Sequence, residues 1–201
     1  MTPQRRPMLG CLLEIAETLA LTLIIFFVIQ TFVAQPYKVQ QRSMQHTLEP
    51  EQYVLVDKLT PRFDTYKRGD IVVFTPPPDW VQEDGTPFIK RVIGLGGDTV
   101  DIRDGHVFIN GTEIQEPYLY AEPPSAPPQE TTVQGDEHKW TIAPGDVFLM
   151  GDHRMNSEDS RTFGPVAVSQ VIGRAWLRYW PLDTFGILPT PTYPGLPSAG
   201  P

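Results

Sequence analysis

The alternation that decides the fold lies in residues 88–114, which read FIKRVIGLGGDTVDIRDGHVFINGTEI. Apolar and polar residues alternate through most of this stretch, and that period of two is typical of strands with one face on a core. The dipeptides Asp-Gly at 104–105 and Asn-Gly at 110–111 favour tight hairpin turns, because both central residues of such turns need positive φ. The sequence therefore predicts a strand followed by a small antiparallel meander over residues 99–115.

Other stretches with strand character lie on both sides of this region. They are GDIVVF at 69–74, APGDVFLMGD at 143–152 and VIGRAWLRYW at 171–180. No helical apolar period of useful length follows residue 35, whereas residues 76–78, 122–135 and 189–201 are rich in proline and lack any period. We therefore expect a mostly β protein, with an antiparallel β domain over residues 35–188, a proline-rich loop at 122–135 and a disordered tail from 189.

An apolar segment over residues 9–34 precedes this domain. Its last part, LALTLIIFFVIQTFVA at 19–34, carries no charge, and the whole segment exceeds the roughly 20 apolar residues that span a bilayer. The following FVAQPY lacks a small-x-small cleavage site, so an uncleaved transmembrane anchor is favoured over a signal peptide. Basic residues lie on both sides and orient the segment only weakly. We expect residues 1–8 in the cytoplasm and the β domain outside.

Composition and charge exclude several classes of protein. The chain has 201 residues, with 16 Lys and Arg against 24 Asp and Glu, and a net charge of -8. A dedicated nucleic-acid binder would need a basic face. The single cysteine, Cys11, excludes disulfides within the chain, and the four histidines lack the spacing of metal motifs. GxSxG is absent, which disfavours hydrolases with a nucleophile elbow. We expect no metal and no cofactor.

Lys90 and Ser43 are the residues that could carry chemistry. The period of two places Lys90 on the same face as Phe88 and Val92. A buried lysine needs its pKa lowered by roughly 3 units to be neutral near pH 7 to 8, and desolvation can supply this shift. Alternation alone leaves open whether that face is buried or solvated. Ser43 follows the apolar segment closely, and an extended chain of this length reaches at most about 30 Å, so its chemistry would take place near the membrane.

Four motifs now add a family resemblance. SMQHTLE at 43–49, RGDIVVF at 68–74, KRVIGLGGD at 90–98 and GDHRMNSEDSR at 151–161 occur in this order after the apolar segment. Together they resemble the type I signal peptidases, the bacterial leader peptidases. The resemblance implies a membrane-bound serine endopeptidase with a Ser/Lys dyad and a mostly β fold. It also implies an extracytoplasmic catalytic domain at the cell membrane that removes signal peptides from exported preproteins and is linked functionally to the secretion translocon.

The resemblance also implies a role for individual residues. Ser43 would be the nucleophile, Lys90 the general base, and Ser157 would orient the lysine amine. Charged residues that brace the site would be Asp159, Arg161, Arg91 and Asp152. Cleavage would follow an Ala-x-Ala site, with pockets lined by Met44, Leu48, Phe88, Ile89, Tyr37 and Val39.

Some positions depart from the family pattern. Gln40 and Gln41 stand where many members have Pro-Ser, so the serine hydroxyl that often completes the oxyanion hole is missing, and Gln41 could donate through its amide instead. Further departures are His46, His153, Met155 and Gly96. Two alternatives stay open at this point: a degenerate β domain that binds exported segments without cutting them, and a Ser/Lys protease that matures a different exported substrate.

Overall fold

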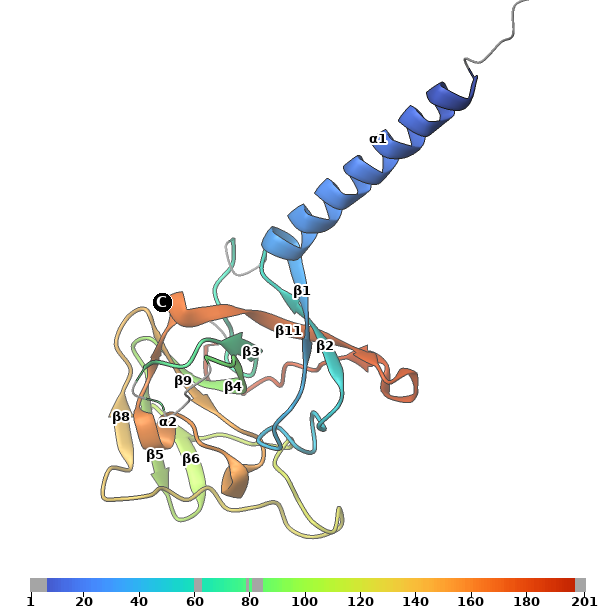
Figure 1. The fold of residues 1–201 in the computed structure, drawn as a ribbon. Coiled ribbons are helices and arrows are strands. Elements are labelled where there is room, and N and C mark those ends of the chain that lie inside the picture. The colour runs from blue at the N-terminus through green and yellow to red at the C-terminus, as the bar shows by residue number, and fades with distance from the viewer. Residues whose placement is uncertain (1–6, 60–62, 79, 81–84, 198–201) are drawn as a thin grey trace, which may run out of the picture.

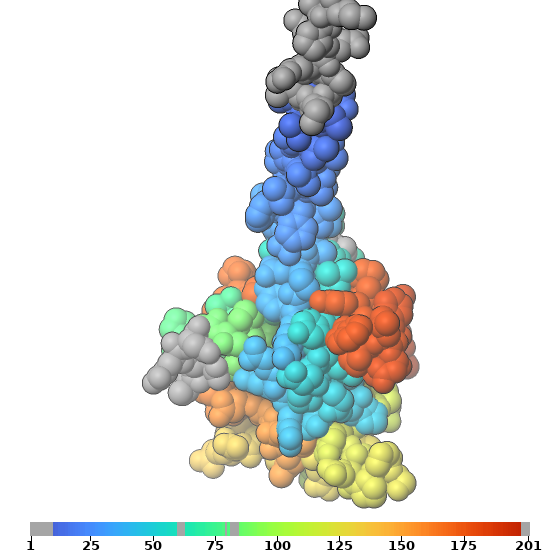
Figure 2. All heavy atoms as spheres, turned by 45° about the vertical axis from the view of Figure 1, so that its right-hand side comes forward, coloured from blue at the N-terminus to red at the C-terminus, as the bar shows by residue number. Residues whose placement is uncertain are grey.

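The N-terminal apolar segment forms a helix that stands clear of the rest of the chain (Figures 1 and 2). A computed structural model describes residues 7–59, 63–78, 80 and 85–197. Helix α1 spans Pro7–Val28 and continues as a short π-helix, Ile29–Val33. The stretch Gly10–Val33 has a mean hydropathy of 2.3 and is long and apolar enough to cross a membrane. The helix ends one residue before the predicted boundary, because Ala34 already begins strand β1.

The body consists of two antiparallel sheets. The larger has the order β1-β2-β11-β3-β4-β9-β10, with β12 paired to β11, and the smaller has the order β7-β6-β5-β8. A short helix, α2 (Ser160–Phe163), follows β9. The strands are β1 (Ala34–Lys38), β2 (Tyr53–Asp57), β3 (Ile71–Phe74), β4 (Phe88–Leu95), β5 (Thr99–Arg103), β6 (His106–Ile109), β7 (Thr112–Glu113), β8 (Lys139–Thr141), β9 (Asp146–Met150), β10 (Val166–Ala167), β11 (Val171–Trp180) and β12 (Gly186–Ile187).

The meander predicted for residues 99–115 is present as β5, β6 and β7. Asp104 and Gly105 have φ of 51° and 81°, and Asn110 and Gly111 have φ of 52° and 83°, as both hairpin turns require. Strands β3, β4, β9 and β11 also lie within the predicted stretches. Strands β1, β2, β8, β10 and β12 were not predicted. Strand β1 contains a proline, and β8, β10 and β12 are short. Strand β2 reads YVLVD, and its apolar interior shows no alternation in the sequence.

Strand β4 lies at the centre of the larger sheet, between β3 and β9. All its residues except Ile89 are buried, so both faces of the strand are covered. The register with β9 shifts between Val92 and Gly94. A Cβ on Gly94 would lie only 2.6 Å from Val100 Cγ2. Only glycine therefore fits at this position, where β4 lies close against β5 of the smaller sheet. This central strand therefore has a fixed position and register.

The residues after β12 differ from the expected disordered tail. Tyr193 is only 8% exposed, and its hydroxyl lies 3.0 Å from the Tyr118 hydroxyl. Thr190 Oγ1 donates a hydrogen bond to Asp70, and Leu188 joins the core cluster under β1 and β2. Proline restricts the unfolded chain and so lowers the entropic cost of ordering such a segment. Proline content alone therefore gave the wrong expectation for residues 189–197, and residues 198–201 lie outside the described part.

Candidate active site

The fold brings Ser43 and Lys90 into direct contact. Ser43 lies in the turn of residues 41–47 that follows β1, and Lys90 lies in the central strand β4. The Lys90 amine Nζ and the Ser43 hydroxyl Oγ are 2.9 Å apart, within hydrogen-bond distance. The amine also lies 3.3 Å from the carbonyl oxygen of Ile89, to which it donates. Ser43 is 3% exposed and Lys90 is 1% exposed, so water is largely excluded from the pair.

Burial sets the protonation of Lys90. Desolvation lowers its pKa from 10.5 to about 8, while the carboxylates of Asp159 and Glu158 act in the opposite direction. The ring of Phe88 lies under the amine, 4.9 Å from Nζ to the ring centroid. At pH 8 about half of the amines are then neutral, against well below one in a hundred for a solvated lysine. The site can therefore hold an uncharged amine beside a serine hydroxyl, as general-base catalysis requires.

The turn that carries Ser43 is fastened to the segment after β9. The backbone N–H of His153 donates to the carbonyl oxygen of Ser43 at 3.0 Å. Gly151 lies so close that a Cβ on it would meet the Ser43 carbonyl oxygen at 2.5 Å and Ser157 Oγ at 2.3 Å. Only glycine permits this approach. Among the described residues, the backbone N–H of Ser43 has no acceptor, so it remains available to a ligand.

Arg91, Asp152 and Thr47 form a buried link behind the dyad. Arg91 donates to both carboxylate oxygens of Asp152, from Nε at 2.8 Å and from Nη2 at 2.6 Å. Burial alone would lower the pKa of Arg91, but the charge of Asp152 raises it above its ordinary value. Thr47 Oγ1 donates to Asp152 as well. The link therefore joins three segments: the strand that carries Lys90, the turn that carries Ser43 and the segment after β9.

Ser157, Asp159 and Arg161 form a second buried link. Arg161 donates to both oxygens of Asp159, at 2.8 and 2.9 Å, and Gly151 N donates to the same carboxylate at 3.0 Å. Burial would raise the pKa of Asp159, but these hydrogen bonds outweigh it and lower the pKa. Ser157 was expected to orient the lysine amine. In the structure its hydroxyl donates to Asp159 Oδ2 at 2.7 Å instead, because that carboxylate is the stronger acceptor.

Two depressions lie beside the dyad. The first, here called the β1 pocket, has a volume of about 180 Å³ and is lined by Tyr37, Val39, Gln41 and Ile89 among others. The second, the serine pocket, has a volume of about 530 Å³ and contains Ser43, Gln41, Phe88, Ser157 and Glu158. Four of the predicted pocket residues, Tyr37, Val39, Phe88 and Ile89, therefore line a depression.

Met44 and Leu48 do not line these two pockets. Both are completely buried and belong to the core cluster that includes Val54 and Val56 of β2. Their side chains point under the turn, because the helical hydrogen bond from Leu48 N to the Met44 carbonyl oxygen, 2.7 Å long, places them on its inner face. In this structure they anchor the turn of Ser43 and do not form a surface for a ligand.

Comparison with known proteins shows the family. The family model described as signal peptidase, peptidase S26, matches residues 12–180. The chain belongs to the S26 signal peptidase family. It is 37% identical over 189 residues to the signal peptidase I of Leptolyngbya laminosa, covering 90% of this chain and 87% of that one. It is 34% identical over 168 residues to signal peptidase I P of Bacillus subtilis subsp. natto, covering 83% and 88%. A crystal structure of a signal peptidase I from Enterococcus faecalis matches with a TM-score of 0.45 and 32% identity, over 55% of this chain and 97% of that one.

This membership confirms the predicted family, the mostly β fold and the activity of a serine endopeptidase with signal peptidase I function. It does not assign the roles of single residues. Among the described residues, no group of three His, Cys, Asp or Glu side chains is placed to hold a metal ion.

Several contacts near the signal peptidase site could not be anticipated from the sequence. The ring of His153 stacks on Tyr120, with ring centroids 4.0 Å apart, and its Nδ1 lies 3.0 Å from Gln45 Oε1. Partial burial lowers the pKa of His153. His46 has φ of 82°, which a proline cannot adopt, so this turn could not hold a proline at position 46. Arg154 is buried and pairs with Glu116, a partner that lies 38 positions away and that the sequence pattern does not indicate.

Proposed function

We propose that Ser43 is the nucleophile and Lys90 the general base of this peptidase. The observation that carries the proposal is the 2.9 Å contact between the Ser43 hydroxyl and a buried amine whose pKa is about 8. Neutral Lys90 takes the hydroxyl proton as Ser43 Oγ attacks the scissile carbonyl carbon. The resulting ammonium returns the proton to the leaving amine, which leaves an acyl ester on Ser43. A water molecule, deprotonated by the same amine, then hydrolyses this ester.

N–H donors around the serine pocket stabilise the tetrahedral oxyanion. The backbone N–H of Ser43 has no acceptor among the described residues and is the first donor. The side chain of Gln41 is exposed at the edge of both the β1 pocket and the serine pocket, so its amide can supply the second. One such donor is worth about 10²- to 10³-fold in rate.

The substrate binds as an extended strand beside the β1 pocket. Strand β1 is an edge strand of the larger sheet, and an edge can accept an added peptide strand through backbone hydrogen bonds. The β1 pocket, with its volume of about 180 Å³, is lined by Tyr37, Val39 and Ile89 and admits small side chains. We therefore expect cleavage after Ala-x-Ala at the end of signal peptides of exported preproteins.

Helix α1 anchors the peptidase in the membrane. The apolar stretch Gly10–Val33 is not buried inside the structure, as expected for a lipid-facing helix. With the body on the extracytoplasmic side of the cell membrane, the site meets preproteins as they leave the secretion translocon. Residues 1–8, 9–34, 35–188 and 189–201 would then be the cytoplasmic end, the anchor, the catalytic domain and the tail.

Cleavage of a preprotein by single-residue variants tests the dyad. The full chain in detergent is incubated with a preprotein that carries an Ala-x-Ala site, and the product is sequenced from its N-terminus. Ser43→Ala and Lys90→Ala abolish cleavage, whereas the exposed Ser169→Ala and Lys139→Ala retain it. Cleavage at the wild-type rate by either dyad variant would disprove the assignment.

A covalent serine-directed probe gives a second test of the dyad. The probe is useful because Gln41 stands where many members of the family have a serine. An active dyad gives labelling of Ser43 that Lys90→Ala removes, whereas an absence of labelling at Ser43 would contradict its role as the nucleophile.

A further inference from the structure

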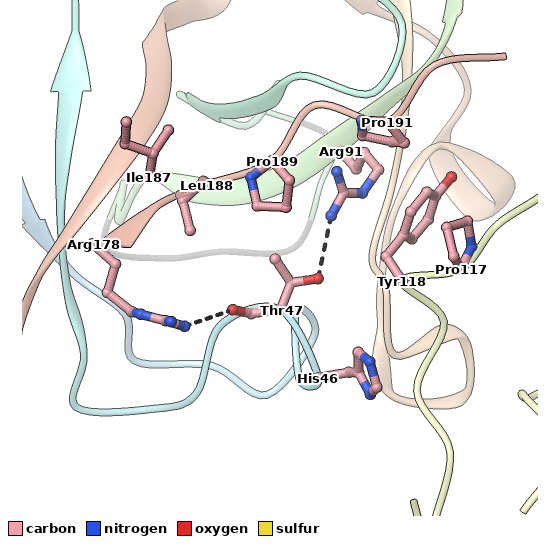
Figure 3. Close-up of a pocket in the computed structure, with 10 residues that line it drawn as sticks. All are labelled: His46, Thr47, Arg91, Pro117, Tyr118, Arg178, Ile187, Leu188, Pro189 and Pro191. Atoms are coloured by element: carbon pink, nitrogen blue, oxygen red, sulfur yellow. Dashed lines mark hydrogen bonds between the residues drawn. The ribbon is translucent and has the colours of Figure 1, made fainter. Parts of the chain in front are cut away.

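A third cavity lies away from the Ser43 hydroxyl, between the end of the chain and the turn of Ser43. Its walls come from residues 187–191, here called the strap, from the turn at His46 and Thr47, and from Arg91, Arg178 and residues 117–118 (Figure 3). Its volume is about 510 Å³, which is within the range for small-molecule sites. We call it the strap pocket. The family model ends at residue 180, so the strap lies beyond the matched region.

Three basic side chains line the strap pocket. Arg91, Arg178 and His46 line it, and no carboxylate does among the residues that line it. The charge of Arg91 is neutralised by Asp152. Arg178 differs, because its hydrogen bonds go to the backbone carbonyl oxygens of Thr184 and Thr47, at 2.6 and 3.1 Å. Within the described part of the chain no carboxylate forms an ion pair with it. In a protein with a net charge of -8, this is a local positive site.

Arg178 has donors left for a ligand. A guanidinium carries five N–H donors, and the two hydrogen bonds to carbonyl oxygens use one on Nε and one on Nη1. Three N–H groups remain, two of them on Nη2. A carboxylate fits such a fork through paired hydrogen bonds, a geometry that lysine cannot offer.

The remaining wall of the strap pocket is apolar. Ile187, Leu188, Pro189 and Pro191 form one side, and the ring of Tyr118 with Pro117 forms the other (Figure 3). Ile187 is 74% exposed, so its side chain has unburied surface at the rim. A ligand that covers this surface gains about 25 cal/mol per Å² of apolar area removed from water. The cavity thus suits a molecule with one anionic end and one apolar end.

We propose that the strap pocket binds a small organic carboxylate that carries an aromatic or branched apolar group. The carboxylate pairs with the free donors of Arg178, and the apolar group lies between the strap and Tyr118. Because Thr47 bonds to Arg178 through its carbonyl oxygen and to Asp152 through its hydroxyl, the ligand lies against the turn that carries Ser43. This site is separate from the peptidase chemistry and does not depend on the proposed dyad.

Ligand-detected NMR with phenylacetate tests the site. Saturation transfer from the full chain in detergent to phenylacetate is measured over a concentration series, with phenylacetamide as the neutral analogue. We expect saturable binding of phenylacetate in the millimolar range and at least about tenfold weaker binding of phenylacetamide. Ser43→Ala leaves binding unchanged, because the active site does not hold the ligand.

Variants that remove or add a charge show whether Arg178 binds the carboxylate of phenylacetate. Arg178→Gln weakens phenylacetate binding about tenfold or more, and Arg103→Gln, a surface arginine on the other sheet, leaves it within about twofold. Arg178→Gln also removes the hydrogen bond to the carbonyl oxygen of Thr47. A second pair of variants therefore changes Ile187, the exposed residue at the rim of the strap pocket. Ile187→Asp weakens binding through repulsion, whereas Ile187→Lys does not. Equal binding of the acid and the amide, a signal that does not saturate, or binding unchanged in both Arg178→Gln and Ile187→Asp would overturn the proposal.

Discussion

The substitution Lys90→Met measures how much the buried amine of Lys90 lowers the free energy of unfolding. Methionine has nearly the same length and no charge, and Lys90 is 1% exposed. Because burial lowers the pKa of Lys90 from 10.5 to about 8, the folded state binds fewer protons than the unfolded state between these two pH values. The free energy of unfolding of the wild type therefore rises with pH in this window. The variant lacks this titration.

The magnitude follows from the shift. About 2.5 pKa units at about 1.4 kcal/mol each correspond to a penalty of about 3 kcal/mol at pH 7. Loss of the hydrogen bond to Ser43 Oγ removes about 1 kcal/mol of stabilisation. Lys90→Met is thus expected to be more stable than the wild type by about 2 kcal/mol at pH 7, while being inactive. The difference in the free energy of unfolding between Lys90→Met and the wild type declines from pH 8 to pH 10 and disappears near pH 10.

Urea unfolding of the full chain in detergent, followed by tryptophan fluorescence at pH 7, 8, 9 and 10, measures this difference. Lys139→Met, a substitution at an exposed position of β8, is the matched control and changes stability by at most about 0.5 kcal/mol at each pH. A Lys90→Met variant that is less stable than the wild type at pH 7, or an advantage that does not vary with pH, would refute the reasoning.

Three further predictions concern the pH profile, the oxyanion and the residues after β12. The value of kcat/KM rises with pH to a plateau, with a midpoint near 8, because the base must be neutral. Glu158→Gln moves this midpoint down by a few tenths of a pH unit, whereas Glu137→Gln leaves it unchanged. Equal pH profiles for the two variants would count against Lys90 as the base. Gln41→Ala lowers kcat by about tenfold or more with KM nearly unchanged, and steady-state kinetics with an unchanged kcat would exclude its amide as a donor. Tyr193→Phe loses the contact with the Tyr118 hydroxyl and lowers the free energy of unfolding by about 1 kcal/mol, so a urea midpoint equal to that of the wild type would show that the contact contributes nothing.

The sequence predicted those parts of the fold that have local causes. The hairpin turns after β5 and β6 follow from the positive φ that Asp-Gly and Asn-Gly tolerate, and strand β5 follows from the alternation in TVDIR. The tail could not be predicted, because its order depends on distant partners such as Tyr118 and Asp70. Strand β2 was missed because its interior residues are all apolar.

In the candidate site, too, the sequence indicated some features, and others depend on contacts between distant residues. Ser43 and Lys90 are 47 positions apart, and alternation alone left open whether the face that carries Lys90 is buried or solvated. The ordered motifs singled out the pair through the family resemblance. The hydrogen bond of Ser157 to Asp159 and the burial of Met44 depend on side-chain packing that no motif records. The strap pocket could not be predicted from the sequence, because its basic and apolar walls come from five separate segments.

Titration of the Lys90 amine shows whether this residue is neutral at the pH at which the peptidase works. Lysine labelled with ¹³C at Cε is incorporated into the full chain, the Lys90 resonance is identified by its absence in Lys90→Met, and its chemical shift is followed from pH 6 to pH 11. We expect a midpoint near 8. A midpoint at the ordinary lysine value near 10.5 would show that the amine is charged at working pH, and Lys90 could not then be the base.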